Sequence, residues 1–203
     1  MTAVSPVSIC SNALLMLGAK PIADFNEAAA TGSNLDRAKL CANLYPATRL
    51  AVLRGHYWNC CARRAYLSPD ATPPAFGYAN RFQLPGDWLR TWAVGDERNR
   101  QRIDYRSEGR YLLADETVLP LLYAADTPEH EWDSLLVDVM TMSMVVRLAY
   151  PITASTSVED LRAAELKMLM QQARAVDGQD DPPQTLGDFP LLSSRFGSVF
   201  GGR

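Results

Sequence analysis

The first part of the chain has apolar residues at the three-to-four-residue spacing of an α-helix. One such stripe begins beside Pro6, a residue that favours the first helical turn, and is stopped by Gly18. A second stripe runs over about residues 34–56, after Ser33, which stands where a capping residue is expected. Pro46 removes one backbone hydrogen bond from this second helix, so a kink is predicted there.

The second predicted helix is apolar on two sides. A helix of this kind lies between partners rather than on a surface, so we expect both sides to be covered. The two apolar faces consist of Ala38, Cys41, Tyr45 and Val52 on one side, and of Leu40, Leu44, Ala47 and Ala51 on the other.

Between residues 60 and 125 the apolar period changes from helical spacing to alternation, which is typical of strands. The clearest alternation covers residues 76–84 and ends at Pro85. Pro120 cannot donate a backbone hydrogen bond, which predicts that its strand lies at a sheet edge. We therefore predict a small antiparallel sheet of about four to six strands. The other candidate strands are residues 61–67, 89–94, 102–105, 110–113 and 118–124.

Helical spacing returns after Trp132. The stretch from there to Tyr150 is apolar nearly all round, and a fourth helix is predicted from Ser157 to about Val176. No apolar run reaches the ~20 residues that span a bilayer, and a signal peptide is not expected. After Gly178 the chain becomes polar and rich in proline, with large apolar residues only at intervals, which predicts an extended arm.

Together these patterns predict an α+β fold, mainly α: a four-helix bundle with an inserted small antiparallel β-sheet and an extended C-terminal arm. The bundle is predicted from residues 1–59 and 126–177, the inserted sheet from residues 60–125, and the arm from residues 178–203. The third helix, being apolar nearly all round, needs more partners than a small monomer offers.

Charge is divided unevenly along the 203 residues. Residues 37–110 hold thirteen Lys and Arg against six Asp and Glu, a net charge of +7. Residues 111–203 hold six against fourteen, a net charge of −8. This division favours a surface that meets an opposite surface, either nucleic acid or another copy of the chain, and scattered solvated charge is the simpler alternative. With 47% hydrophobic and 21% charged residues, a disordered chain is excluded.

The sequence contains no motif for catalysis or cofactor binding: there is no GxGxxG, no P-loop, no HExxH and no GxSxG. His56 with Cys60 and Cys61 is the one candidate metal cluster, and its spacing matches no tetrahedral zinc pattern. We therefore predict that the protein is not an enzyme and has no catalytic, metal or cofactor site. The four cysteines are expected to be buried free thiols.

Five segments, in a fixed order along the chain, carry a family resemblance. They are SICSNALLMLGAKPI at residues 8–22, LYPATRLAVLRGHYWN at 44–59, FQLPGDWLR at 82–90, EGRYLLAD at 108–115 and LAYPI at 148–152. Together they resemble the tail tubular protein A family of tailed bacteriophages. The resemblance covers about residues 8–177 and rests on all five segments occurring in this order.

The resemblance implies a virion structural protein, the head-to-tail adaptor, assembled in the bacterial cytoplasm into a ring of about a dozen copies in the neck. Its implied partners are the portal protein above, a tail or nozzle protein below, and DNA that passes through the lumen without sequence specificity. No membrane and no cofactor are implied. Two alternatives stay open: a non-viral DNA-binding or assembly module, and a small enzyme.

Three sets of residues are predicted to matter. Ring contacts are expected between arginines of one copy and acids of its neighbour, because the two charged segments are complementary. Trp58 and His56 are predicted to be structural, since they follow directly after a long helix. The arm is expected to bind the portal. The ring-contact residues are Arg98, Arg100, Arg102 and Arg106 with Asp126, Glu129 and Glu131, and the arm residues are Phe189, Leu191, Leu192, Phe196 and Phe200.

Overall fold

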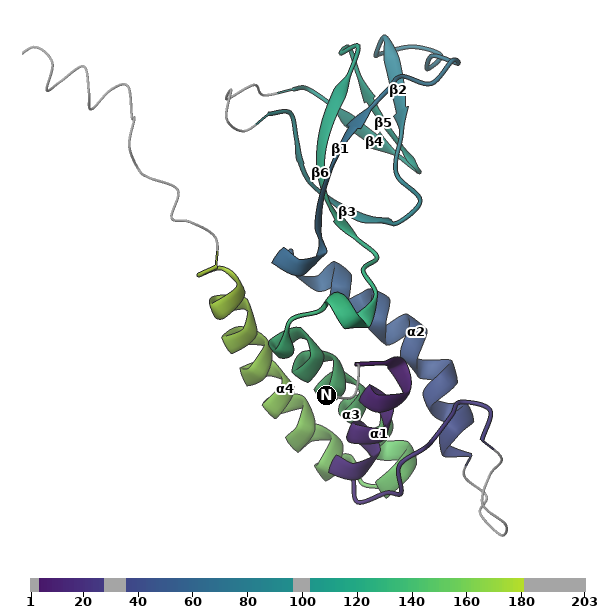
Figure 1. The fold of residues 1–203 in the computed structure, drawn as a ribbon, viewed down its shortest axis with the longest axis vertical. Helices are drawn as coiled ribbons and strands as arrows, with labels where there is room; N and C mark the ends of the chain where they lie inside the picture. The colour runs from purple at the N-terminus through teal and green to yellow at the C-terminus, as the bar shows by residue number, and fades with distance from the viewer. Residues whose placement is uncertain (1–3, 28–35, 97–102, 181–203) are drawn as a thin grey trace, which may run out of the picture.

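Helices and strands occupy separate lobes of the computed structural model, which describes residues 4–27, 36–96 and 103–180 (Figure 1). The helical lobe contains α1 (Pro6–Met16), α2 (Arg37–Gly55), α3 (Ser134–Thr153) and α4 (Thr156–Asp177). The β lobe, residues 62–125, is inserted between α2 and α3. Two short 3-10 helices, η1 (Asn59–Cys61) and η2 (Glu129–Glu131), lie at the junction of the lobes. The predicted arm lies outside the described residues from position 181 onward.

Each helix begins at a residue whose side chain accepts a hydrogen bond from the first turn. The Ser5 hydroxyl accepts from the Ser8 N–H at 3.2 Å, and Ser8 reciprocates to form a capping box. α2 begins after Asp36, whose carboxylate accepts from the Lys39 N–H at 3.0 Å. The start predicted after Ser33 lies outside the described residues. Asp133 and Ser155 cap α3 and α4 in the same way.

α3 continues past Tyr150, where the apolar stretch predicted from the sequence ends. Pro151 lies inside its last turn, and α3 ends at Thr153. The turn is closed without an N–H from Pro151, because the Ala154 N–H donates to the Tyr150 carbonyl at 2.8 Å and the Thr153 hydroxyl donates to the Ala149 carbonyl at 2.7 Å. A proline is tolerated where such bonds satisfy the last carbonyl groups.

α3 is the centre of the helical lobe. It packs against α4, α1 and α2, whereas α1 and α2 touch each other only slightly. The predicted four-helix bundle is therefore wrong: the fold is α+β, and its helical lobe is one central helix with three others around it. α1 has 11 residues against 20 in α3, too few to run alongside it over its whole length. The α3 residues with no exposed surface include Leu136, Val139, Met140, Met144 and Leu148.

The expectation that no apolar stretch is long enough to span a bilayer does not hold for α3. With 20 residues and a mean hydropathy of 1.5, α3 is long and apolar enough to cross a membrane by length and composition. Half of that stretch is buried inside the protein. Its central position, in contact with three helices, accounts for the apolar composition without a membrane.

The β lobe consists of two three-stranded antiparallel sheets, not the single sheet predicted. One sheet has the order β1-β6-β3, with β1 (Ala62–Leu67), β6 (Leu119–Ala125) and β3 (Trp88–Val94). The other has the order β2-β5-β4, with β2 (Asn80–Gln83), β5 (Tyr111–Ala114) and β4 (Arg106–Glu108). They share a core that includes Leu67, Phe82, Leu84, Leu112, Leu119 and Leu121.

The chain passes back and forth between the two sheets, since β1, β3 and β6 belong to one and β2, β4 and β5 to the other, and this explains the error. Pro85 lacks an N–H to continue the β2 ladder, and β3, which follows it in the other sheet, has two irregularities in its register with β6. The predicted strand at residues 76–84 is also too long, because residues 76–79 have no strand pairing and Phe76 is exposed. β4 begins at Arg106, later than the strand predicted at residues 102–105.

Pro120 lies in β6, the central strand of its sheet, so the prediction of an edge strand is wrong. The reason is the direction in which its nitrogen faces. The Pro120 carbonyl accepts from the Gly95 N–H at 2.9 Å, and in a strand the nitrogen of a residue faces the same side as its carbonyl. That side faces the end of β3, where the pairing with β6 has stopped at Val94 and Leu121. No ladder bond needs the missing N–H.

Candidate functional site

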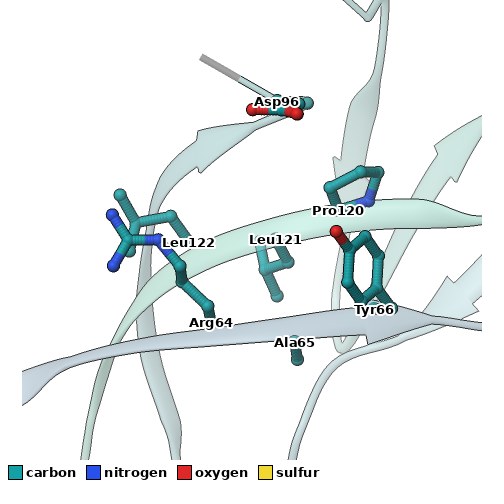
Figure 2. A pocket seen from close by; sticks show the side chains of 8 residues that line it. Arg64, Ala65, Tyr66, Asp96, Pro120, Leu121 and Leu122 are labelled. Carbon is teal, nitrogen blue, oxygen red and sulfur yellow. The ribbon is translucent and has the colours of Figure 1, made fainter. Parts of the chain in front are cut away.

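The solvent-facing side of the β1-β6-β3 sheet is hollowed. Arg64 and Tyr66 alternate on β1 with residues of the core side, and their partners across β6 are Leu122 and Pro120. Figure 2 shows the side chains of Arg64 and Tyr66 rising on one side of β1, with Ala65 on the other. The hollow has a volume of about 640 Å³, and Asp96 lies on its rim. Tyr66 is 79% exposed. We call this surface the outer sheet face.

An arginine–aromatic stack lies beside the outer sheet face. The rings of Tyr57 and Trp92 are stacked with centroids 4.9 Å apart, and the Arg90 guanidinium carbon lies 4.1 Å from the Tyr57 centroid. The Tyr57 hydroxyl donates to the Thr91 carbonyl at 3.1 Å, which fixes the ring against β3. Arg90 also donates to the Arg54 carbonyl at 3.4 Å. The stack holds a cation in a fixed place at the surface.

Arg64 and Arg90 of the outer sheet face lie opposite Leu122 and Ala124 of β6. Within the described parts of the chain neither arginine forms an ion pair, whereas Arg63 and Arg81 each pair with a carboxylate. An exposed face with two such arginines and an exposed tyrosine is suited to anionic groups and to stacking on a planar ring. Sequence reasoning missed this face. Its signal was the alternation of residues 62–67, which places Arg64 and Tyr66 on one side.

The acids predicted for ring contacts have arginine partners in their own chain. Arg49 of α2 forms ion pairs with Glu129, at 2.7 Å between Nε and Oε1, and with Asp126. It also donates to the Thr127 carbonyl at 2.7 Å and lies 5.5 Å from the Trp132 ring. Arg49 was missed because nothing in a sequence pairs residues about eighty positions apart. These contacts join the helical lobe to the chain that leaves the β lobe.

Tyr45 completes this junction. Its hydroxyl donates to Glu129 Oε1 at 3.0 Å. Burial raises the pKa of the Tyr45 hydroxyl, and the nearby Glu129 charge raises it further, so the group stays a donor. The third predicted acid, Glu131, pairs with Arg63 at 2.6 Å in a more exposed position. We call the contacts of Arg49, Tyr45, Asp126 and Glu129 the arginine junction.

The arginines predicted to face those acids are not brought to them within the chain. Arg98, Arg100 and Arg102 lie outside the described residues. Arg106 lies in β4, an exposed edge strand of the β2-β5-β4 sheet, while the acids lie at the base of the β lobe (Figure 1). The contact between copies stays a prediction. The arm residues Phe189, Leu191, Leu192, Phe196 and Phe200 lie outside the described residues.

Trp58 and His56 connect the ends of α2 and α4. Trp58 has no exposed surface, and its indole Nε1 donates to the Val52 carbonyl at 3.1 Å. His56 meets the Trp58 ring edge-on with centroids 4.7 Å apart, and its Nε2 lies 3.1 Å from Asp177 Oδ2. The Asn59 N–H donates to Asp177 Oδ1 at 3.0 Å. Burial raises the pKa of the Asp177 carboxyl, although its hydrogen bonds oppose that shift.

Metal-binding chemistry has no assembled site in the described residues, where no group of three or more His, Cys, Asp and Glu is placed to hold an ion. The four cysteines are free. The chain matches no protein-family model and no curated protein. His56 contacts Trp58 and Asp177, and Cys60 and Cys61, whose sulfurs lie 3.9 Å apart, form only a pair. The resemblance to the phage family stays a prediction.

Proposed function

We propose that this chain is a structural subunit of a bacteriophage virion, a head-to-tail adaptor that assembles side by side into a ring between the portal and the tail nozzle. Genomic DNA passes through the ring, and assembly takes place in the bacterial cytoplasm. The ordered segments described for the sequence support the family, and the charge division supports contacts between copies.

The observation that carries the proposal is an apolar stripe on α4. One side of α4 packs against α3, and the other leaves Leu161 58% and Met168 71% exposed. With Ala164 and Ala175, which are also exposed, these residues recur at heptad spacing along the helix. We call Leu161, Ala164, Met168 and Ala175 the outer α4 stripe. A stripe of this spacing on a soluble subunit is typical of a helix that packs against another chain.

Electron microscopy tests the proposal. The purified chain is mixed with portal rings from the same virus, and stacked rings are expected, with the chain forming a layer beneath the portal. A chain that stays monomeric at all concentrations, with and without portal, contradicts the proposal.

A second candidate function, a non-viral DNA-binding module, is favoured by the outer sheet face. It predicts that a monomer binds DNA with an affinity that falls steeply as salt rises. Arg64→Ala and Tyr66→Ala would then weaken binding, whereas Arg147→Ala, on the exposed side of α3, would not. Fluorescence anisotropy with a labelled oligonucleotide at several salt concentrations measures this. If the Arg64→Ala, Tyr66→Ala and Arg147→Ala variants all bind DNA equally and weakly, the second function is contradicted.

A further inference from the structure

α2 has a second apolar stripe that its own chain leaves uncovered. The inner face predicted from the sequence is buried, as its residues Ala38, Cys41, Tyr45 and Val52 show. On the opposite side the described chain covers Leu40 and Leu44 only in part and leaves Ala47, Leu50 and Ala51 exposed. We call these five residues the outer α2 stripe. The described chain therefore covers only one of the two apolar faces predicted for this helix.

The two outer stripes lie on opposite flanks of the helical lobe. α3 packs against both α2 and α4, and Figure 1 shows α4 on the left and α2 on the right with α3 between them. One copy therefore cannot pair its own two stripes. A contact between two different surfaces of identical subunits is heterologous, and it generates a ring when the rotation between neighbouring copies closes on itself.

Contacts within one chain fix the position of α2 relative to α4 along the length of the helical lobe. Their C-terminal ends are joined, since His56 lies against Asp177, 121 positions further along, and Arg174 donates to the Gly55 carbonyl at 3.1 Å. Both helices run toward the junction with the β lobe (Figure 1). In a ring whose copies stand at one level, a residue of α2 thus lies beside the residue about 121 positions later in α4 of the next copy.

This register brings complementary shapes together. Leu40 falls level with Leu161, and Ala47 falls level with Met168. Both pairs of residues repeat after seven positions, the spacing at which two helices pack with their axes nearly aligned. Met168 of the outer α4 stripe meets the small Ala47 of the outer α2 stripe, which leaves room for it, and Leu161 meets Leu40.

The same register brings opposite charges together. α2 contains four basic residues and no acid, and the first turns of α4 carry Glu159 and Asp160. Lys39 falls level with Asp160, and within the described residues neither forms an ion pair. At the other end Arg54 and Arg174 are like charges, but Arg174 is bonded to the Gly55 carbonyl of its own copy. Charge therefore favours the alignment at the N-terminal ends.

We infer that the outer α4 stripe of one copy packs against the outer α2 stripe of the next, in parallel register, with Met168 over Ala47 and Asp160 beside Lys39. The occupant of each stripe is a second copy of this chain. The inference rests on the proposed ring and names the contact that closes it.

Cross-linking tests the register directly. The double variant Ala47→Cys, Met168→Cys is assembled on portal rings and treated with a short bis-maleimide. A ladder of covalent multimers is expected on a denaturing gel. Each single variant and the unaltered chain are the controls, because they have only one or neither of the introduced thiols. Rings that form normally but give no ladder in the double variant overturn the register while the proposed function stands.

Charge and burial are tested by substitution. Met168→Glu is expected to raise the concentration for half-assembly roughly tenfold or more, since it places a charge in the contact. Phe76→Glu, at an exposed apolar position of the β lobe, is the matched control and leaves assembly unchanged. Lys39→Glu weakens assembly, and adding Asp160→Lys restores it. Rings that tolerate Met168→Glu overturn the inference, and the absence of any ring, with or without portal, overturns the proposed function and the inference with it.

Discussion

Removing Arg49 should destabilise the protein more than any other exchange of a partly exposed arginine. Its side chain is 15% exposed and that of Glu129 is 13% exposed, so the pair is largely withdrawn from water. Breaking such a pair costs about 3–5 kcal/mol, because the remaining charge is left buried. Here Glu129 keeps the Tyr45 hydroxyl as a donor, which reduces the loss. We expect Arg49→Met to lower the free energy of unfolding by about 2–3 kcal/mol.

A double-mutant cycle separates the pair from its surroundings. Arg49→Met, Glu129→Gln and the double variant are unfolded in urea and followed by circular dichroism, and a coupling free energy of about 1.5 kcal/mol is expected. The matched control is Arg63→Met with Glu131→Gln, whose side chains are 41% and 44% exposed. A pair this exposed contributes only ~0–1 kcal/mol. Additive effects at the Arg49 pair within about 0.5 kcal/mol, or equal losses at both pairs, would refute the reasoning.

Three further predictions concern single side chains. Trp58→Ala should cost about 3–5 kcal/mol and lower the melting temperature, because a fully buried indole and its hydrogen bond are lost; normal melting contradicts this. Folding raises the pKa of Asp177 above the value of about 3.8 that it has in the unfolded chain. Ionisation of Asp177 therefore lowers the free energy of unfolding as pH rises from about 3.8 through the raised pKa. In a urea series across this range Asp177→Asn should flatten that fall, and an unchanged slope contradicts the assignment. Cys60, half-buried, should react first in a native thiol titration, ahead of the three buried cysteines; simultaneous reaction of all four contradicts the burial.

Local signals made the helices predictable. Pro6 marks the start of α1, and a hydroxyl or carboxylate precedes the first turn of every helix, so each start could be predicted within about three residues of its observed position. The inner face of α2 could be predicted in the same way, because the apolar residues on the buried side of a helix recur every three to four positions. These features depend on residues within one or two turns of each other.

Long-range pairing was not predictable. Whether six short strands form one sheet or two depends on which strands meet, and Pro120 could be placed only once Gly95 was known to face it. The arginine junction depends on residues some eighty positions apart. For the candidate site, alternation on β1 placed Arg64 and Tyr66 together, but the stack of Tyr57 on Trp92 required the folded junction.

The insertion of the β lobe has a consequence for synthesis of the chain. α1 and α2 are made first, but the helix that covers their buried faces, α3, begins about eighty residues after α2 ends. At ribosomal rates of roughly 5–20 residues per second, those faces wait for about 4–16 seconds. All six strands of the β lobe are present only near the end of that interval, when the lobe can close its own core. The nascent protein is therefore exposed to aggregation and to chaperones over the whole stretch between α2 and α3, and pauses in translation there lengthen the exposure.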